Sequence, residues 1–593
     1  MAHRLLKGTL LLTITGFITR VLGFFYRIYL ADLLGAHYLG IYQLIFPVYA
    51  ICFTIYGAGI QTALSQVIAS RKNDRENPSG CLRLFVIGTV IAMALALLLQ
   101  FLLSSNAEWV AIHFVMEVSL TPYLRIMTVF FPFCCLSACI NGYYYGIQDA
   151  KIPAMTQVIE QIFRIVFVFG ISYLLIPGAT PQENCRIAVW GLAVGEISSC
   201  FYNVYKLACH LRSQRKNAYR MVYGENVKRS HKSKADVRKY HFMKSVDRGG
   251  VYSLVWLAST LTVTRLFITL LNSIETVLLP AMLRKYGYSG EEALSIYGVL
   301  TGMTFSFLLF PSTITNSLAV LLVPSIAEAD AAGNIRMIRK SIILSIRYCL
   351  LLGILCTGFF MVFGMELGRV IFHNEMAGEY LVTLSWLCPF LYLATALTSI
   401  INGMKKTHIT FLITAVSLGI KIVFLVLAVP RYGMRLYLIG LLVSQLLQVI
   451  LELIYLCPHF RTEGKRQDKE DRFEPVCQIL LPSLLILPCT IAAKSSYQWS
   501  GNCFGNVSIV CLLIAGIVFY FYSNNIMCRI CCRSVSDRQS YSDFAFGEGF
   551  FGDSSSKVRP RLPSLVIVLF KRIFNSPQAS TSAIFSENGI SLT

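Results

Sequence analysis

Two arginines lie inside the first apolar stretch of the chain, Leu10–Leu30, where no acidic residue can neutralise them. A guanidinium in the hydrocarbon core of a bilayer costs about 3 kcal/mol on insertion scales, so it usually faces a bundle interior or a watery cavity. Arg20 and Arg27 are about two helical turns apart and therefore project from one face, with Gly23 between them. Because guanidinium groups bind pyrophosphate oxygens bidentately, the pair predicts an anionic, phosphorylated cargo.

Other charged residues also lie deep in apolar stretches. Glu160 and Arg164 are four residues apart, so they can pair on one helix face or contact a substrate. Lys421 has no acidic residue within a turn, so it faces a cavity or pairs with another helix. The predicted cavity cations are Arg20, Arg27, Arg164, Arg265 and Lys421, and the predicted counter-charges or proton and ion sites are Glu160, Glu196 and Glu275, with Glu452 as a further candidate.

The composition is that of a membrane protein. Apolar residues make up 55% of the 593 residues, charged residues 14%, and the mean hydropathy is +0.61. The net charge of +21 comes mostly from short loops between apolar stretches, so we predict no nucleic-acid partner. We predict an all-α, polytopic fold with fourteen spans: 8–31, 39–68, 84–104, 121–147, 152–177, 187–210, 250–281, 293–326, 341–365, 380–404, 408–429, 435–457, 477–493 and 505–523.

The distribution of basic residues between alternate loops predicts the orientation. Loops on the side of the N-terminus hold 27 Lys and Arg residues, and loops on the opposite side hold 7. Positively charged loops stay in the cytoplasm. We therefore predict a multi-pass protein of the plasma membrane with both termini in the cytoplasm.

The chain also repeats itself in order, which predicts two six-helix lobes of the same orientation with a substrate site between them. The matches are Pro132-Phe133 with Pro389-Phe390, Arg164 with Lys421, Gly191-Leu192 with Gly440-Leu441, and Thr19-Arg20 with Thr264-Arg265. The predicted domains are a first lobe (1–210), a basic cytoplasmic loop (211–249), a second lobe (250–457), a charged linker (458–476), helices 13 and 14 (477–524) and a partly disordered cytoplasmic tail (525–593).

No motif in the sequence indicates catalysis. It holds no Walker motif, no HExxH, no GxSxG and no glycine-rich dinucleotide loop. Its one CxxC, Cys528–Cys531, has no second pair and predicts no metal site. We predict no enzyme and no cofactor, and transport would draw on an ion gradient, the membrane potential or the cargo's own gradient.

Three stretches carry a resemblance to a known family: Gly16–Lys72 (beginning GFITRVLGFFYRIYL), Ile296–Ala329 and Cys388–His408. They resemble stage V sporulation protein B and its relatives, in the MviN/MurJ-like part of the multidrug/oligosaccharidyl-lipid/polysaccharide exporter superfamily. Arg20 matches the first arginine of that family's first span, whereas Arg27 is shifted by one position.

The resemblance implies a fourteen-helix flippase with a central cationic cavity, and a groove for a polyprenyl tail beside helices 13 and 14. Its implied cargo is a polyprenyl-pyrophosphate-linked saccharide, with lipid II favoured, moved from the inner to the outer leaflet by alternating access. That cargo serves peptidoglycan or spore cortex synthesis, so the lipid bilayer and cell-wall synthases are the implied partners.

Two other classes of function remain open. A drug or cation antiporter of the same superfamily would want acidic residues deep in the first lobe, and Arg20 and Arg27 argue against a cationic cargo. A non-transporting scaffold for a lipid-linked precursor would use the same cationic cavity to bind without moving anything.

Overall fold

The computed structural model describes residues 2–71, 78–175, 178–223 and 248–457, which fall within one compact unit. These residues form helices and turns with no strand, which confirms the all-α fold. Eleven of the helices are long and apolar enough to cross a membrane, and a bent pair supplies a twelfth. The protein is therefore a multi-pass membrane protein. The charged linker, the spans 477–493 and 505–523, and the tail lie outside the described residues, so the count of fourteen stays a prediction.

We call residues 2–223 the first half of the described chain and residues 248–457 the second half. The first half comprises α1 (Ala2–Phe53), α2 (Gly59–Arg71), α3 (Pro78–Ser105), α4 (Ala107–Trp109), α5 (Thr121–Thr128), α6 (Phe131–Gly146), α7 (Lys151–Phe169) and α8 (Pro181–Tyr223). The second half comprises α10 (Arg248–Tyr286), α11 (Gly290–Gly298), α12 (Phe305–Leu309), α13 (Ser312–Ala331), α14 (Ile335–Ile371), α15 (Glu375–Leu384), α16 (Cys388–Gly403), α17 (Thr407–Leu427), α18 (Val429–Tyr432) and α19 (Met434–Leu456).

A single glycine separates the first two predicted spans. A helix of the 52 residues of α1 would be about 78 Å long, far more than one crossing needs. Gly35 interrupts it with φ +67° and ψ 172°, a backbone conformation that residues with a side chain rarely adopt. The second part of α1 then continues through a π-helical segment, Thr54–Ala58, into α2. The break predicted between residues 31 and 39 is thus a turn at one residue. The prediction was too long because a hydropathy average does not resolve so short a turn.

Prolines mark further breaks. Helices α5 and α6 meet at a bend of 52° just before Pro132. Pro311 stands between α12 and α13, and Pro389 opens α16 after a 3-10 turn. Proline has no backbone N–H and clashes with the preceding turn, so helices begin or bend there.

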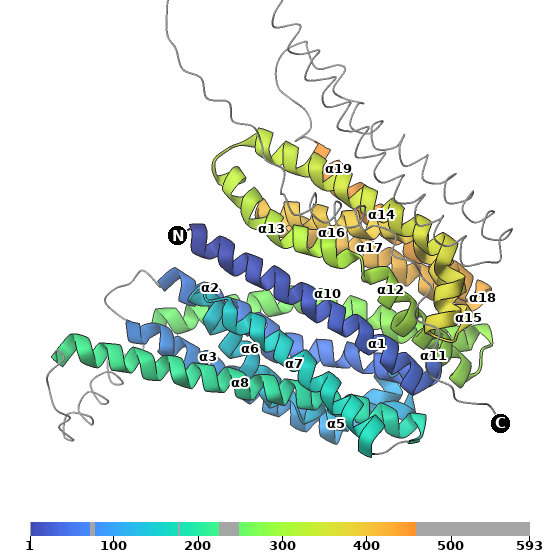
Figure 1. Ribbon diagram of the computed structural model, residues 1–593, viewed down its shortest axis with the longest axis horizontal. Helices are drawn as coiled ribbons and strands as arrows, with labels where there is room; N and C mark the ends of the chain where they lie inside the picture. The colour runs from blue at the N-terminus through green and yellow to red at the C-terminus, as the bar shows by residue number, and fades with distance from the viewer. Residues whose placement is uncertain (1, 72–77, 176–177, 224–247, 458–593) are drawn as a thin grey trace, which may run out of the picture. The chain divides into compact units, whose positions relative to one another are not determined.

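Helix α1 lies between the two halves (Figure 1). It packs against α7 and α8 in the first half and against α10, α11 and α13 in the second. The approach to α11 is very close, because a Cβ atom on Gly298 would lie 2.1 Å from the Ala36 carbonyl oxygen and 2.6 Å from the Gly40 nitrogen. Small residues allow membrane helices to touch through their backbones. The halves therefore meet tightly at the end of the bundle where Gly35 turns.

Candidate functional site

The Arg20 cavity, named for its one charged lining residue, has a volume of about 520 Å³. Arg20 reaches it from α1, and the other walls come from α13, α16 and α19 of the second half. The cavity is therefore built across the two halves. Its polar lining residues besides Arg20 are Asn316, Thr395, Thr398, Ser399, Gln445 and Gln448.

The neutral polar walls of this cavity follow from helical spacing. Thr398 and Ser399 follow Thr395 by three and four residues on α16, so both lie on its face of the helix. Gln445 and Gln448 share a face of α19 in the same way, and their side chains are joined by a 3.5 Å hydrogen bond. Hydroxyl and amide groups both donate and accept hydrogen bonds. A cation among such groups, with no carboxylate lining the cavity, suits an anion that carries hydroxyl or amide groups.

Sequence reasoning missed these neutral residues because it looked for charges. Their signal was available, since polar side chains at a helical period inside otherwise apolar spans mark one wetted face.

Arg27 lies further along α1, within electrostatic range of Tyr42 and Arg164. Between the two arginines, Gly23 faces α7: a Cβ on Gly23 would lie 3.6 Å from the Gln161 amide nitrogen, an ordinary van der Waals contact. The predicted pair thus shares one side of α1, with Arg20 at the cavity and Arg27 beside α7. No carboxylate in the described ranges forms an ion pair with either one.

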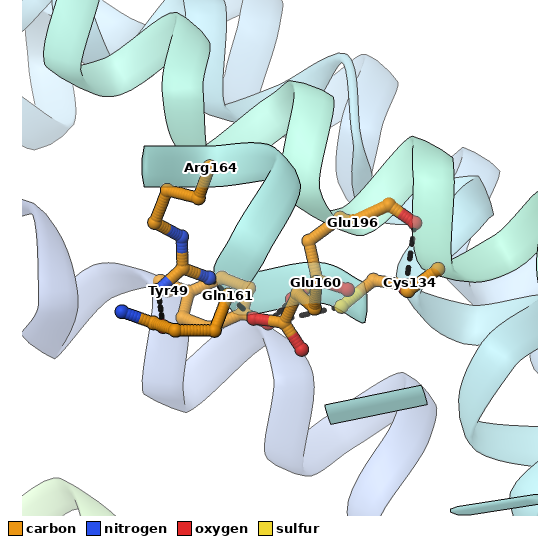
Figure 2. Close-up of polar contacts among 7 residues, drawn as sticks. Tyr49, Cys134, Glu160, Gln161, Arg164 and Glu196 are labelled. Carbon is orange, nitrogen blue, oxygen red and sulfur yellow. Dashed lines mark hydrogen bonds and ion pairs between the residues drawn. The ribbon is translucent and has the colours of Figure 1, made fainter. Parts of the chain in front are cut away.

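Arg164 belongs to a polar cluster inside the first half (Figure 2). It forms an ion pair with Glu160 and donates a 3.4 Å hydrogen bond to Gln161. Close by, Tyr49 of α1 donates a 3.3 Å hydrogen bond to Glu196 of α8. The Tyr49 hydroxyl also lies 2.9 Å from the sulfur of Cys134 on α6. The cluster therefore draws its side chains from four helices of the first half.

Two glycines bring α7 and α8 close enough to form this cluster. A Cβ on Gly195 would lie 2.9 Å from the Glu160 carbonyl oxygen, and one on Gly191 would lie 2.3 Å from a Val168 methyl. Gly191 and Gly195 are four residues apart, which is the spacing of the small-residue packing motif in membrane helices. Glu196 follows Gly195 directly, so the close contact positions it beside Glu160.

A second cavity, the Lys421 cavity, has a volume of about 460 Å³. Lys421 of α17 lies 3.0 Å from a carboxylate oxygen of Glu275 on α10. Tyr437 of α19 donates a hydrogen bond to the other oxygen of Glu275. Lys421 therefore both lines a cavity and pairs with another helix. Arg164 and Lys421, which the repeat aligns, are each paired with a glutamate.

Arg265 lines neither cavity. Its Nη1 donates a 2.8 Å hydrogen bond to the carbonyl oxygen of Ala58, at the end of the π-helical segment before α2. Helix α10 comes close enough because Gly59 has no side chain, and a Cβ there would lie 1.9 Å from the Thr262 hydroxyl. The hydrogen bond thus ties Arg265 to the backbone of the first half.

A further contact between the halves escaped sequence reasoning. Arg284, at the end of α10, forms an ion pair with Glu117 and donates a 2.8 Å hydrogen bond to the Met116 carbonyl oxygen. The contact lies between the α4–α5 connection and the C-terminal end of α10. It is at the same end of the bundle as Gly35 and the start of α11.

Taken together, the structure brings four of the predicted residues into the first half's cluster or next to it: Arg27, Arg164, Glu160 and Glu196. It pairs Glu275 with Lys421 in the second half, and it places Arg20 at a cavity and Arg265 against the Ala58 carbonyl oxygen. Within the described residues, no group of three or more His, Cys, Asp or Glu side chains is arranged to hold a metal ion.

Comparison with known proteins agrees with the predicted resemblance. Residues 5–330 match the model of a family described as polysaccharide biosynthesis protein. The chain is 27% identical to stage V sporulation protein B of Bacillus subtilis, over 70% of this chain and 79% of that protein. It is 22% identical to the lipid II flippase MurJ of the same organism, over 72% of this chain and 78% of that protein.

A solved structure shares the fold. An inward-facing multidrug resistance MATE transporter of the MOP superfamily superposes with a TM-score of 0.56 at 14% sequence identity. The superposition covers 75% of this chain and 96% of that one. The family match and the two relatives confirm the predicted resemblance to stage V sporulation protein B and its relatives, and the solved structure confirms the fold.

Proposed function

The chain belongs to the polysaccharide biosynthesis protein family, and from this membership and its cavities we propose that it is a flippase for a polyprenyl-pyrophosphate-linked saccharide. Lipid II is the proposed cargo, moved from the inner to the outer leaflet for peptidoglycan or spore cortex synthesis. Stage V sporulation protein B and the lipid II flippase MurJ, both similar over most of their length, support this choice. Cell-wall synthases, which consume such a cargo, are the proposed partners.

The observation that carries the proposal is the chemistry of the Arg20 cavity. One guanidinium stands among six neutral hydroxyl and amide side chains, and no acidic residue lines the cavity. A guanidinium binds phosphate oxygens bidentately, and the neutral groups suit the hydroxyl and amide groups of a saccharide. A cationic drug would meet a like charge there.

The ion pairs elsewhere strengthen this choice. Glu160 neutralises Arg164, and Glu275 neutralises Lys421. Of the other predicted cavity cations, Arg265 is bound to the Ala58 carbonyl oxygen, and Arg20 and Arg27, both on α1, have no carboxylate partner among the described residues. A pyrophosphate entering between the halves would meet a positive field from that one helix. We propose that Arg20 contacts the pyrophosphate and that Arg27 attracts it further into the protein.

The close contacts at one end of the bundle support alternating access. Gly40 and Gly298 touch there, and Arg284 is bound to Glu117. The Arg20 cavity lies away from that end, and the middle turns of α16 and α19 line it. The excess of basic loops at that other end favours its being cytoplasmic. We propose that the plasma-membrane protein faces the cytoplasm in this conformation and loads its cargo from the inner leaflet.

Binding and flipping test the proposal separately. The protein is reconstituted in nanodiscs and titrated with lipid II, undecaprenyl phosphate and a cationic dye, with native mass spectrometry as the readout. A charge-assisted hydrogen bond contributes about 1.5–3 kcal/mol, so Arg20→Ala is expected to weaken lipid II binding about 10- to 150-fold. Arg369→Ala is the matched control, because that arginine is exposed and pairs with Glu375 outside both cavities.

Flipping is then measured as the fraction of fluorescent lipid II that a membrane-impermeant quencher reaches in proteoliposomes. The flippase proposal would be supported if the wild type and Arg369→Ala both flip lipid II and Arg20→Ala does not. Binding without flipping would favour the scaffold. Dye binding without lipid II binding would favour the antiporter and overturn the proposal.

A further inference from the structure

Glu452 lies near the C-terminal end of α19 and is completely buried. Its Oε1 accepts a 2.6 Å hydrogen bond from the Thr398 hydroxyl and a 3.2 Å hydrogen bond from the Gln448 amide. Within the described residues, its Oε2 has no hydrogen-bond partner. Because Thr398 and Gln448 both line the Arg20 cavity, the carboxyl group is separated from that cavity by one layer of side chains.

Among the described residues, no cation forms an ion pair with Glu452. Helix α19 packs against α15, α16, α17 and α18 and the turn before α16. Four of the charged and titratable side chains of these elements are exposed: Glu379, His408, Arg431 and Tyr432. Four others are engaged elsewhere: Glu375 with Arg369, Lys421 and Tyr437 with Glu275, and Tyr392 with the Leu308 carbonyl. The rest form no hydrogen bond or ion pair with Glu452: Tyr380, Cys388, Arg435 and Tyr455. Arg20 is the cation across the cavity.

Burial without a cation disfavours the charged form of a carboxyl group. An isolated buried carboxylate is very costly, and in proteins such a group takes up a proton instead. Two neutral donors on one oxygen compensate only part of that cost, and the other oxygen is bare. A protonated carboxyl group is neutral and, like an amide, both donates and accepts hydrogen bonds.

The first half has a neutral amide at the corresponding position. The spacing that takes Gly191-Leu192 onto Gly440-Leu441 takes Asn203 onto Glu452, and the spacing that takes Pro132-Phe133 onto Pro389-Phe390 takes Asn141 onto Thr398. Asn203 is also completely buried; its Oδ1 accepts a 2.6 Å hydrogen bond from Thr156, and its Nδ2 donates a 3.4 Å hydrogen bond to Asn141. The repeated fold thus holds a neutral group at this position in one half and a titratable one in the other.

We propose that Glu452 is a proton-binding site, filled in this conformation, whose proton exchanges with the Arg20 cavity and whose protonation favours an anionic cargo there. The coupling to cargo rests on the proposed function, whereas the proton site does not. The proton is taken up from water in the cavity and returned to it, with no other bond made or broken. An ionised Glu452 would repel a pyrophosphate across Thr398 and Gln448. By linkage, the bound anion holds the proton on Glu452 to the same extent.

Infrared spectroscopy tests the proton site without cargo. The full-length protein in nanodiscs is titrated from mildly acidic to basic pH, and the carbonyl band of protonated carboxyl groups is followed. We expect a band that Glu452→Gln removes and that Glu379→Gln, an exposed control, retains. Thr398→Val should shift this band by removing a hydrogen bond, without abolishing it. Identical bands in the wild type and Glu452→Gln would overturn the proton site. Glu452→Gln is expected to fold, because the equivalent position of the first half holds a buried amide, Asn203.

Binding of undecaprenyl pyrophosphate across the same pH range tests the coupling. The pyrophosphate ionises in the same way whichever protein is present, so the difference between the two affinity curves reports on Glu452. We expect wild-type affinity to fall about 5-fold or more relative to Glu452→Gln as the pH rises. Parallel curves would overturn the coupling while leaving the flippase proposal intact. Absence of binding to either protein would instead contradict the flippase proposal, with the infrared result still deciding the proton site.

Discussion

The contact between Gly40 of α1 and Gly298 of α11 allows a quantitative prediction for how closely the two halves meet. A Cβ on Gly298 would lie 2.1 Å from the Ala36 carbonyl oxygen, whereas such atoms essentially never approach within 3.0 Å. The Gly40 nitrogen would lie 2.6 Å from the same Cβ. Both clashing atoms belong to the backbone, so no rotamer change can relieve the clash. In Gly298→Ala, α11 must therefore withdraw from α1 by about 1 Å.

Overpacking of this kind costs about 1–3 kcal/mol. Because the clash exists only where α1 and α11 touch, that cost falls on this conformation and shifts its population about 5- to 150-fold relative to one in which they separate. We expect Gly298→Ala to open this end of the bundle, to increase amide exchange in residues 36–46 and 290–298, and to slow flipping.

Hydrogen-exchange mass spectrometry in nanodiscs measures the opening directly. The matched control is Gly419→Ala in α17, where a new Cβ has nothing within 4 Å. That change should leave exchange near α1 unaltered and raise stability by up to about 1 kcal/mol, through helix propensity alone. If Gly298→Ala exchanged and flipped like Gly419→Ala, the contact would not limit the approach of the halves.

Three further changes address individual contacts. Arg284→Gln removes the ion pair to Glu117, so amide exchange in residues 110–120 should rise with a loss of about 1–3 kcal/mol in local stability; unaltered exchange would contradict a closing role. Lys421→Gln leaves Glu275 buried without its ion-pair partner, which should cost about 3–5 kcal/mol of stability and lower the thermal unfolding midpoint in detergent. Adding Glu275→Gln should restore the midpoint, and a double variant no more stable than the single one would refute this. Gly195→Leu should separate α7 from α8 and reduce the folded fraction on size-exclusion chromatography, whereas an equal loss in Gly16→Leu, a site with open space, would show a general intolerance of leucine.

Sequence reasoning predicted the features that the local composition of the chain determines. Long apolar stretches predicted a membrane-spanning all-α fold, and it is confirmed. Uncompensated guanidinium groups drew attention to Arg20, which lines a cavity between the halves. The break between the first two spans was predicted between residues 31 and 39, but not that it is a turn at Gly35 alone, because one residue with positive φ leaves no trace in a hydropathy average.

Long-range pairing was beyond the sequence for a different reason. Nothing near Lys421 indicates that Glu275, on another helix, lies 3.0 Å away. Nor does anything near Arg265 indicate that a π-helical segment presents the Ala58 carbonyl oxygen to it. Such partners are fixed by glycine contacts such as Gly59 against Thr262, and their distances emerge only once the helices are packed.

The internal repeat makes these departures informative. Arg20 and Arg265 match in sequence, but Arg20 lines a cavity while Arg265 is hydrogen-bonded to the backbone. Asn203 and Glu452 match in the same way, and only the second can gain or lose a proton. A duplicated bundle begins with equal halves, so differences at equivalent positions mark where the halves have taken separate roles. Here the differences place a cation of the first half opposite a titratable carboxyl group of the second, across one cavity. That is the arrangement expected if one half holds an anion and the other senses protons.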